Sequence, residues 1–453
     1  MLRRFAISFF LVLVTVSAPG RTRPHYGGTL HVGIEGDPWA RPDGLAWRLV
    51  LDGLTTVDTG GAVQPSLALD WKTENNAHRW QFHLRPGVQF QDGTPVTSVA
   101  VVESLSASCR AKCPWSEMRA LGSAVVFLSD APMPQLPAVL AGNAFLISRA
   151  LNTGTSGTSG PIGTGAFQVS GFVNGVLSLT ANTNCWRGRP FVDTIEIRVH
   201  RPVQDQWMDL SLGRADVVEV PAEQLRQAQQ QRMQVVESPT ALLLLLHVAD
   251  EGALANPNMR AAIALAIDRT ALSNVIFQKA GQVTASLLPQ SLSGYAFLFP
   301  AERDLNKAHD LRGGLTPPAI TLAADGNRAI QLVAQRIALN LREGGFNVQV
   351  TAPNAVHPNL SLHEVPIQNG NPSAVLEVML ENLGHSAAPA DDGAASLYKS
   401  EREFLDAKTW IPLLDLPRAY AISSRVRDFQ NGADGLPDLA NASIIGPGEE
   451  AAR

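Results

Sequence analysis

The sequence predicts an α/β fold with mixed sheets, divided into more than one domain. Three observations support this prediction. At 453 residues, the chain is longer than one ordinary hydrophobic core accommodates. Strand, turn and short-helix patterns alternate along its first hundred residues. Residues 319–350 have a strand-helix-strand pattern typical of a parallel crossover unit. The composition, 45% hydrophobic and 17% charged residues, is that of a globular protein.

The first 18 residues differ from the rest of the chain. Arg3 and Arg4 precede an apolar run, Phe5–Val16, that is too short to span a bilayer comfortably. Small residues follow at 16–18, where a signal peptidase requires them. We therefore expect a signal peptide over residues 1–18, cleaved near Ala18, and an exported protein. An uncleaved membrane anchor is the alternative.

The charge balance argues against a nucleic-acid partner. The chain has 36 basic and 41 acidic residues, a net charge of −5. Loss of Arg3 and Arg4 with the signal peptide would change the net charge to −7. Such a chain offers no basic field to a nucleic acid or a membrane surface. We expect no nucleic acid among its partners.

The stretch Trp80–Val96 has the clearest local pattern. Apolar and polar residues alternate from 80 to 84, which indicates a half-buried strand. Pro-Gly at 86–87 and Asp-Gly at 92–93 predict two tight turns. A helix should then begin, with Thr97 or Ser98 as its N-cap. On pattern alone, an ordinary hairpin is the alternative.

The same reasoning assigns the other main elements in order. Strands are expected at Gly27–Ile34, Leu177–Asn182, Thr194–Val199, Pro239–His247, Ala319–Ala324 and Phe346–Val350. Helices are expected at Asn256–Phe277 and Ala329–Glu343, each with apolar residues at helical spacing. In Pro161–Phe167, two glycines predict a turn in which backbones approach closely.

Recognisable catalytic motifs are missing from the sequence. There is no Gly-x-Ser-x-Gly elbow and no Walker loop, and His363-Glu364 lacks the second histidine of a zinc protease motif. His357, His363 and His385 are loosely clustered, and we interpret them as solvated loop residues, with a metal site as the alternative. We expect a binding protein with no catalytic residue, metal or cofactor. A secreted hydrolase on an unrelated α/β fold is the less favoured alternative.

The three cysteines have different predicted states. Cys109 and Cys113 are separated by three residues in a protein expected to be exported, which makes them a candidate disulfide. Zinc binding and two free thiols are the alternatives. Cys185 is left over and is expected to be a small buried residue.

Several motifs together resemble one family. HLRPGVQFQDGTPVT at 83–97 resembles the segment LRxGVxFxDGxPxT of the family 5 extracellular solute-binding proteins, the dipeptide, oligopeptide and nickel receptors of bacterial ABC importers. Further similarities are GGTLHVG at 27–33, LAWRLVLDGLTTV at 45–57, PIGTGAF at 161–167 and NPNMRAAIALAIDR at 256–269. The resemblance covers roughly residues 26–430 and is faint over 350–410.

This resemblance implies a two-lobed periplasmic-binding-protein fold of type II-like topology, with mixed sheets and a hinge. Lobe I would comprise residues 26–245 and a return segment, 412–445, and lobe II residues 246–411. The protein would be a periplasmic monomer that captures a peptide or other small solute between the lobes and delivers it to an ABC permease in the inner membrane. A receptor-derived periplasmic chaperone or sensor without a transport role is the alternative.

The resemblance also suggests where ligand would bind. A cleft needs aromatic or apolar lining and a few polar groups. Trp39 and Trp47 are the lobe I candidates, with Trp207 as a further aromatic, and core packing is the alternative for each. His363, Glu364 and Gln368 are the lobe II candidates. The aspartate with which peptide-binding members anchor the peptide's amino terminus is missing from residues 359–376, which puts peptide specificity in doubt. Trp71, Trp80 and Trp186 are assigned to the core.

Overall fold

The computed structural model describes residues 26–40, 44–108, 113–149, 160–313, 319–324, 327–351, 357–368, 370–385 and 393–445. The predicted signal peptide and Cys109 lie outside these residues. Within them, no helix is long and apolar enough to cross a membrane.

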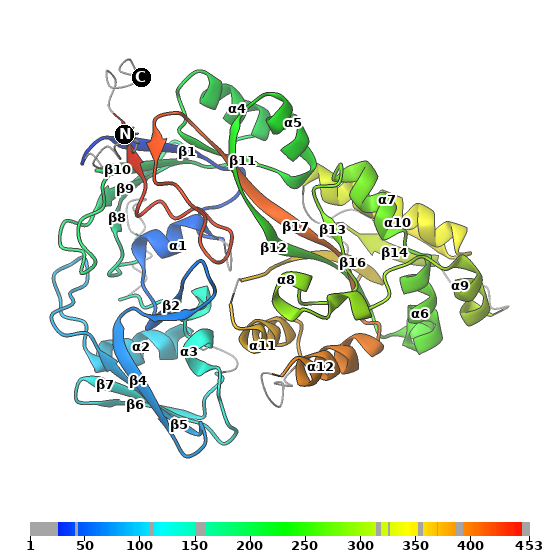
Figure 1. Cartoon of the computed structure of the whole chain (residues 1–453), viewed down its shortest axis with the longest axis horizontal. Helices are drawn as coiled ribbons and strands as arrows, with labels where there is room; N and C mark the ends of the chain where they lie inside the picture. The colour runs from blue at the N-terminus through cyan, green and yellow to red at the C-terminus, as the bar shows by residue number, and fades with distance from the viewer. Residues whose placement is uncertain are drawn as a thin grey trace, which may run out of the picture.

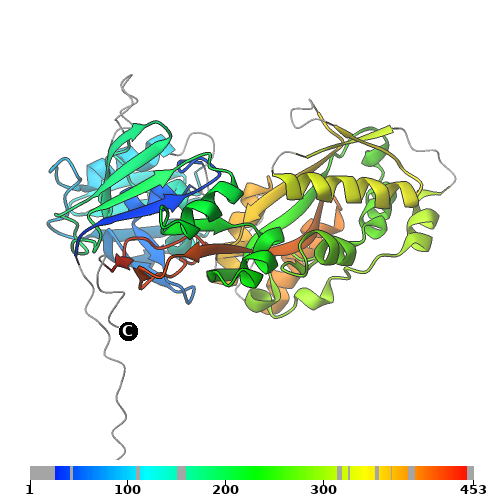
Figure 2. The same ribbon diagram turned by 90° about the horizontal axis from the view of Figure 1, so that it is seen from above.

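Two lobes lie side by side, joined by long strands that run through both (Figures 1 and 2). One mixed sheet continues across the molecule in the order β15-β14-β16-β12-β17-β11-β1-β10-β9-β8. Its strands in lobe I are β1 (Thr29–Gly33), β8 (Phe167–Val173), β9 (Val176–Ala181), β10 (Thr194–Arg198) and β11 (Val217–Val220). Its strands in lobe II are β13 (Gln282–Val283), β14 (Ala319–Ala323), β15 (Asn347–Thr351) and β16 (Leu360–Pro366). The crossing strands are β12 (Gln234–Val248) and β17 (Trp410–Ile422). The predicted mixed α/β fold with two lobes is confirmed.

Lobe I also contains a separate four-stranded antiparallel sheet, ordered β4-β5-β7-β6. Its strands are β4 (Ala68–Glu74), β5 (Arg79–Leu84), β6 (Glu117–Leu121) and β7 (Ala124–Leu128). The predicted alternation holds in β5, where Trp80 and Phe82 are buried. Helix α2 (Ser98–Ser108) follows, with the Thr97 hydroxyl accepting from the Ala100 N–H.

Lobe I is completed by short helices and a small hairpin, which flank the two sheets (Figure 1). They are α1 (Leu45–Val50), β2 (Thr55–Val57), β3 (Val63–Pro65), α3 (Leu136–Val139), η1 (Asn143–Phe145), α4 (Val203–Ser211), η2 (Ala222–Gln224) and α5 (Leu225–Gln230).

Lobe II is a sheet covered by helices on both faces. Its helices are η3 (Gly252–Ala255), α6 (Pro257–Ala266), α7 (Arg269–Ala271), η4 (Leu272–Ile276), α8 (Gln290–Ser293), η5 (Ala296–Leu298), α9 (Leu305–Arg312), α10 (Arg328–Glu343), α11 (Pro372–Asn382) and α12 (Ala394–Asp406). Because side chains alternate along a strand, Leu244 and Leu246 pack toward α6 and α10, whereas Leu243 and Leu245 pack toward α11 and α12. The predicted crossover unit is β14-α10-β15, with parallel strands.

The crossing strands change pairing where the lobes meet. From Gln234 to Ser238, β12 pairs with the C-terminal half of β17, and from Leu242 onward with its N-terminal half. A register irregularity separates the two ladders, and such irregularities bend a strand. The predicted lobe boundaries at 245/246 and 411/412 therefore fall inside β12 and β17. A short pair of strands, β18 (Val426–Arg427) and β19 (Ser443–Ile444), follows in lobe I.

The helix expected over Asn256–Phe277 is broken into pieces. Helix α6 ends at Ala266, and the Asp268 carboxylate caps the next turn by accepting from the Ala271 N–H at 2.8 Å. Arg269 is buried and donates to the Pro412 carbonyl at 2.9 Å, and burial lowers its pKa to about 10. Asp268 and Arg269 thus both bond to backbone groups at the point where the helix breaks.

Candidate functional site

Helix α1 supplies a single polar side chain to the cleft between the lobes. Five of its six residues are buried, and Arg48 is the exception. The PIGTGAF turn packs against the end of this helix. A Cβ on Gly163 would lie 2.2 Å from the Val50 carbonyl oxygen, so only glycine permits the approach. The tight packing fixes the direction in which Arg48 points.

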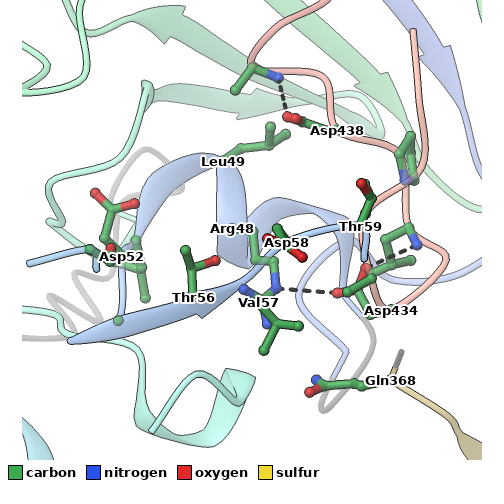
Figure 3. A pocket seen from close by; sticks show the side chains of 18 of the residues that line it. Arg48, Leu49, Asp52, Thr56, Val57, Asp58, Thr59, Gln368, Asp434 and Asp438 are labelled. Atoms are coloured by element: carbon green, nitrogen blue, oxygen red, sulfur yellow. Dashed lines mark hydrogen bonds and ion pairs between the residues drawn. The ribbon is translucent and has the colours of Figure 1, made fainter. Parts of the chain in front are cut away.

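A cavity of about 360 Å³ lies beside α1 (Figure 3). Its walls are α1, residues 51–59 and a C-terminal loop of lobe I, which we define as residues 430–440. Gln368, between β16 and α11, is its contribution from lobe II. The volume is typical of a site for a small molecule.

At one side of this cavity, Asp52 is the acceptor of a buried network. It accepts from the Thr164 hydroxyl at 2.8 Å and from the Trp186 indole at 2.9 Å. Arg187 forms an ion pair with it at 2.8 Å. Burial is the largest single effect and disfavours the charged form of Arg187, but Asp52, Cys185 and Asp438 together outweigh it and raise the Arg187 pKa. Asp52 is therefore a structural carboxylate that already has its cation.

Asp58 occupies the turn between β2 and β3, and its hydrogen-bond partners in the described part of the chain are all neutral. Its carboxylate accepts from the N–H groups of Gly60 and Ala62, both at 2.9 Å, and from the Gln64 amide at 2.8 Å. The Ala62 N–H contributes most to holding the Asp58 pKa below its ordinary value. The cavity wall thus carries a carboxylate that is ionised at neutral pH and that pairs with no cation among the described residues.

Arg48 and Asp434 join α1 to the C-terminal loop (Figure 3). Arg48 Nε donates to Asp434 Oδ2 at 3.2 Å, and its Nη2 donates to the Ala141 carbonyl at 2.9 Å. The Asp434 carbonyl in turn accepts from Arg418 of β17 at 3.1 Å. One residue of the loop therefore bonds both to lobe I and to a crossing strand.

A second cavity of about 200 Å³ adjoins the first and is mostly apolar. It lies between the region of α3 in lobe I and α11 in lobe II, and Phe145, Val375, Val378 and Met379 are among its lining residues. The two cavities share Val57, Gln368, Asp434 and Leu436. They form one cleft with a polar part and an apolar part, which we call the interlobe cleft.

A third cavity, of about 530 Å³, is lined by residues of the crossing strands, by the N-terminal end of α10 in lobe II and by η2 in lobe I. Glu35, Glu219, Glu223 and Glu364 line it. Burial raises the pKa of Glu219 and that of Glu223. Glu219 accepts from the Glu35 N–H at 2.6 Å, which partly satisfies it.

The structure brings the lobe I candidates together, but outside the lining of these cavities. Trp39 and Trp47 contact each other edge-to-face, with ring centroids 5.0 Å apart. The Trp47 indole donates to the Trp39 carbonyl at 3.1 Å, and Trp47 is buried in the lobe I core. Trp207 is also buried and donates to the Glu219 carbonyl at 3.0 Å. All three contribute to packing.

The lobe II candidates are separated. His363 contacts Trp410 and His247, with ring centroids 5.2 and 6.2 Å away. Glu364 points to the opposite face of β16, toward the third cavity, because neighbouring strand residues face opposite ways. Only Gln368 lines the interlobe cleft.

Sequence reasoning missed the charged residues of the cleft. Arg48 and Asp52 lie in LAWRLVLDGL, a segment that the sequence marks only by its resemblance to the family. Asp434 and Asp438 lie in NGADGLPDL, whose Gly, Asp and Pro residues signal turns. Nothing in the sequence shows that this loop meets α1.

Among the described residues, no group of three or more His, Cys, Asp or Glu could hold a metal ion. Cys113 is disulfide-bonded, whereas Cys185 is free and buried. Cys109 is outside the described residues, so its pairing with Cys113 stays a prediction.

Comparisons with known proteins agree with this architecture. The probable di/tripeptide-binding protein 5 of Pseudomonas aeruginosa is 22% identical over 475 residues, covering 87% of this chain and 90% of that protein. The structure of the binding protein AgaA from A. tumefacien R10, in complex with agropinic acid, matches with a TM-score of 0.79 at 19% identity, covering 93% of this chain and 100% of that one. The oligopeptide-binding protein AppA of Bacillus subtilis, in complex with a nonapeptide, matches with a TM-score of 0.76 at 17% identity, covering 94% and 100%.

These structural likenesses show a shared fold. The family model described as "Bacterial extracellular solute-binding proteins, family 5 Middle" matches residues 62–378, more than half of the chain. The relatives and structures named above are binding proteins, as the missing catalytic motifs led us to expect. This chain belongs to family 5 of the bacterial extracellular solute-binding proteins.

Proposed function

We propose that this protein binds a peptide or another small solute in the interlobe cleft and delivers it to an ABC permease of the inner membrane. The observation that carries the proposal is the cleft itself, whose two connected cavities have walls from lobe I, lobe II and the C-terminal loop. Relatives named as peptide-binding proteins support the ligand class. Closure of the two lobes about β12 and β17 would bury the ligand and create the surface that a permease recognises.

Within this proposal, the predicted contact residues have different roles. Gln368 contacts the ligand directly, since it lines both cavities. Trp39 and Trp47 position α1, and thereby Arg48. Contacts of His363 and Glu364 with a ligand stay predictions of the sequence. No residue is assigned a catalytic role.

We further propose that the protein is a periplasmic monomer released from its signal peptide near Ala18. The run of residues 1–18 supports export. N-terminal sequencing of the periplasmic fraction should begin near Pro19, and intact Met1 in membrane pellets would contradict it. The negative net charge supports the further proposal that no nucleic acid is among its partners.

The binding proposal can be tested without knowing the solute. A ligand that binds only the folded protein raises its melting temperature by mass action. We expect at least one member of a broad panel of peptides and small solutes to raise it, and mass spectrometry of protein purified from its native host to identify a bound molecule. A panel without any shift, together with no bound molecule, would favour the chaperone or sensor alternative.

A substitution in the interlobe cleft tests where the solute binds. Gln368→Ala should weaken the binding of any solute found in this way without lowering the melting temperature of the free protein, because the side chain is half-buried. His385→Ala, in the loop after α11, is a control outside the cavity linings. Binding that is unchanged in Gln368→Ala would place the solute elsewhere.

A further inference from the structure

We infer that the solute is an amphipathic cation, with its positive group toward the polar part of the interlobe cleft and its hydrocarbon toward α11. This inference rests on the proposed function and specifies the chemistry of its ligand.

The first argument concerns the balance of charges. The carboxylates that line the cleft are Asp52, Asp58, Glu381, Asp434 and Asp438, and the guanidinium groups are Arg48, Arg187 and Arg418. Acidic groups therefore outnumber basic ones. Closure would remove water from this excess of negative charge, and a cationic ligand would offset the cost.

The second argument identifies which carboxylates are available. Asp434 bonds to Arg48, and Asp52 bonds to Arg187. Asp438 accepts from the Asn441 amide at 2.7 Å, and Arg187 lies near enough to interact with it electrostatically. Among the residues that the structure describes, Asp58 has only backbone N–H groups and Gln64 as partners. Of the four carboxylates that line the polar cavity, Asp58 is thus the best placed for a cationic ligand.

The third argument is the separation of polar and apolar surfaces. The cavity beside Asp58 is lined by Thr55, Thr56 and Thr59, whereas the adjoining cavity is lined by Val375, Val378 and Met379 of α11. Burying hydrocarbon there is favourable at about 25 cal/mol for each Å². A solute that fills both cavities needs a charged or polar end and an apolar end.

The fourth argument is the residue at the junction. Gln368 lines both cavities and has no hydrogen bond to another side chain or backbone group among the residues that the structure describes. A carboxamide donates and accepts but carries no charge. It can bind a polar joint in the solute, such as an amide, and cannot neutralise a cation. Recognition of the positive charge therefore falls to lobe I.

Two sources could supply this chemistry: a short peptide with a free amino group and apolar side chains, or a non-peptide amine. The test uses leucyl-leucinamide and its N-acetylated form, which differ by one charge, and phenethylamine as the non-peptide arm. Leucyl-glutamate provides an apolar side chain with an excess of negative charge. Binding is measured by calorimetry and by the shift in melting temperature.

We expect leucyl-leucinamide or phenethylamine to bind. Acetylation of the dipeptide should lower its affinity for the protein at least tenfold, which corresponds to about 1.4 kcal/mol of binding free energy. Asp58→Asn keeps the oxygen that accepts the hydrogen bonds of the turn and removes the negative charge. The variant should therefore bind the cationic probe about tenfold more weakly and bind the acetylated form with unchanged affinity. Asp205→Asn on α4, an equal charge change outside the cleft, should change neither.

The outcomes separate this inference from the function on which it rests. Preferential binding of leucyl-glutamate, or equal affinity of the acetylated and free dipeptides, would overturn the inference. So would an unchanged affinity in Asp58→Asn. If such a neutral or anionic solute still loses affinity in Gln368→Ala, binding in the cleft stands and only the charge assignment fails. If no solute of any charge binds, the proposed function itself fails.

Discussion

Arg48 and Asp434 are 386 residues apart in the sequence, and Arg48 Nε donates to Asp434 Oδ2 at 3.2 Å. The bond fastens the C-terminal loop to α1, and Asp434 is nearly buried whereas Arg48 is about one-third exposed. Removing Arg48 would leave the Asp434 carboxylate without this cation in a poorly hydrated position.

We predict that Arg48→Gln lowers the free energy of unfolding by about 1–2 kcal/mol, since the exposed part of the pair is screened by water. It should also weaken solute binding, because the C-terminal loop forms one wall of the cleft. Chemical denaturation and calorimetry would measure the two effects. Arg119→Gln is the matched control, since Arg119 pairs with Glu117 on an exposed strand and should change neither quantity. Wild-type stability in Arg48→Gln would contradict a fastening role.

Local patterns in the sequence predicted the elements around this pair well. The alternation at 80–84 indicated β5, and the helical spacing at 329–343 indicated α10. The two glycines of PIGTGAF predicted a close backbone approach, which occurs against α1 at Gly163. These features depend on the residues themselves and on their immediate neighbours.

The site was harder to predict, because it depends on which face each element turns inward. Trp39 and Trp47 have the residue type that a cleft requires, but the rotation of α1 directs Trp47 into the core and Arg48 toward the cleft. The meeting of Arg48 with Asp434 is set by the whole fold. Of the lobe II candidates, Gln368 lines the cleft, because it follows the end of β16. Its contact with a ligand stays a prediction.

Replacing Trp39 tests the aromatic candidates. If Trp39 lined the cleft, as its choice as a candidate implies, Trp39→Ala would weaken binding with little loss of stability. Because Trp39 packs against Trp47, we now expect a loss of about 1–2 kcal/mol in the free energy of unfolding. We expect the affinity for solute to change less than it does in Gln368→Ala. A melting temperature equal to that of the wild type, with a lost affinity, would instead make Trp39 a ligand contact.

Trp80→Ala serves as the reference for a core substitution. Trp80 is buried, and its indole donates to the Met133 carbonyl at 2.9 Å. Truncation leaves a cavity and an unpaired carbonyl, at a cost of about 3–5 kcal/mol. Circular dichroism during thermal unfolding should show a loss well beyond that of Trp39→Ala. A smaller loss would remove Trp80 from the set of essential core residues.

The next prediction is the number of free thiols, which follows from the states of the three cysteines. Cys113 is disulfide-bonded and Cys185 is free and buried. If Cys109 is the partner of Cys113, the denatured, non-reduced protein should react with one equivalent of thiol reagent. The native protein should react slowly, because Cys185 is 8% exposed. Three equivalents in the denatured protein would show that the disulfide is absent.

The last prediction concerns two buried carboxyl groups of lobe II. Glu401 on α12 is fully buried and accepts from the Tyr295 hydroxyl at 2.8 Å and from the Leu288 N–H at 3.2 Å. Asp415 on β17 is 3% exposed, and its Oδ1 has no hydrogen-bond partner among the described residues. Burial raises the pKa of each to about 7, and the charge of Glu401 adds to the effect on Asp415.

The sign of the pH dependence follows from these raised pKa values. Between the unfolded pKa values near 4 and the folded values near 7, the folded protein binds more protons than the unfolded chain. The free energy of unfolding should therefore fall as the pH rises through this window, by up to about 1.4 kcal/mol per pH unit for each carboxyl. Above pH 7 this contribution should stay constant.

We expect the melting temperature to be higher at pH 5.5 than at pH 8, and Asp415→Asn to raise it at pH 8 while flattening the dependence. Asparagine resembles the neutral carboxyl in shape and cannot ionise. Asp406→Asn at the exposed end of α12 is the control and should leave the profile unchanged. Asp216 has the opposite effect: burial raises its pKa, but His31, Arg425 and Ser423 together outweigh burial and lower it. Its contribution to the pH dependence lies below the window. A profile of Asp415→Asn that parallels the wild type between pH 5.5 and 8 would show that Asp415 is ionised in the folded protein.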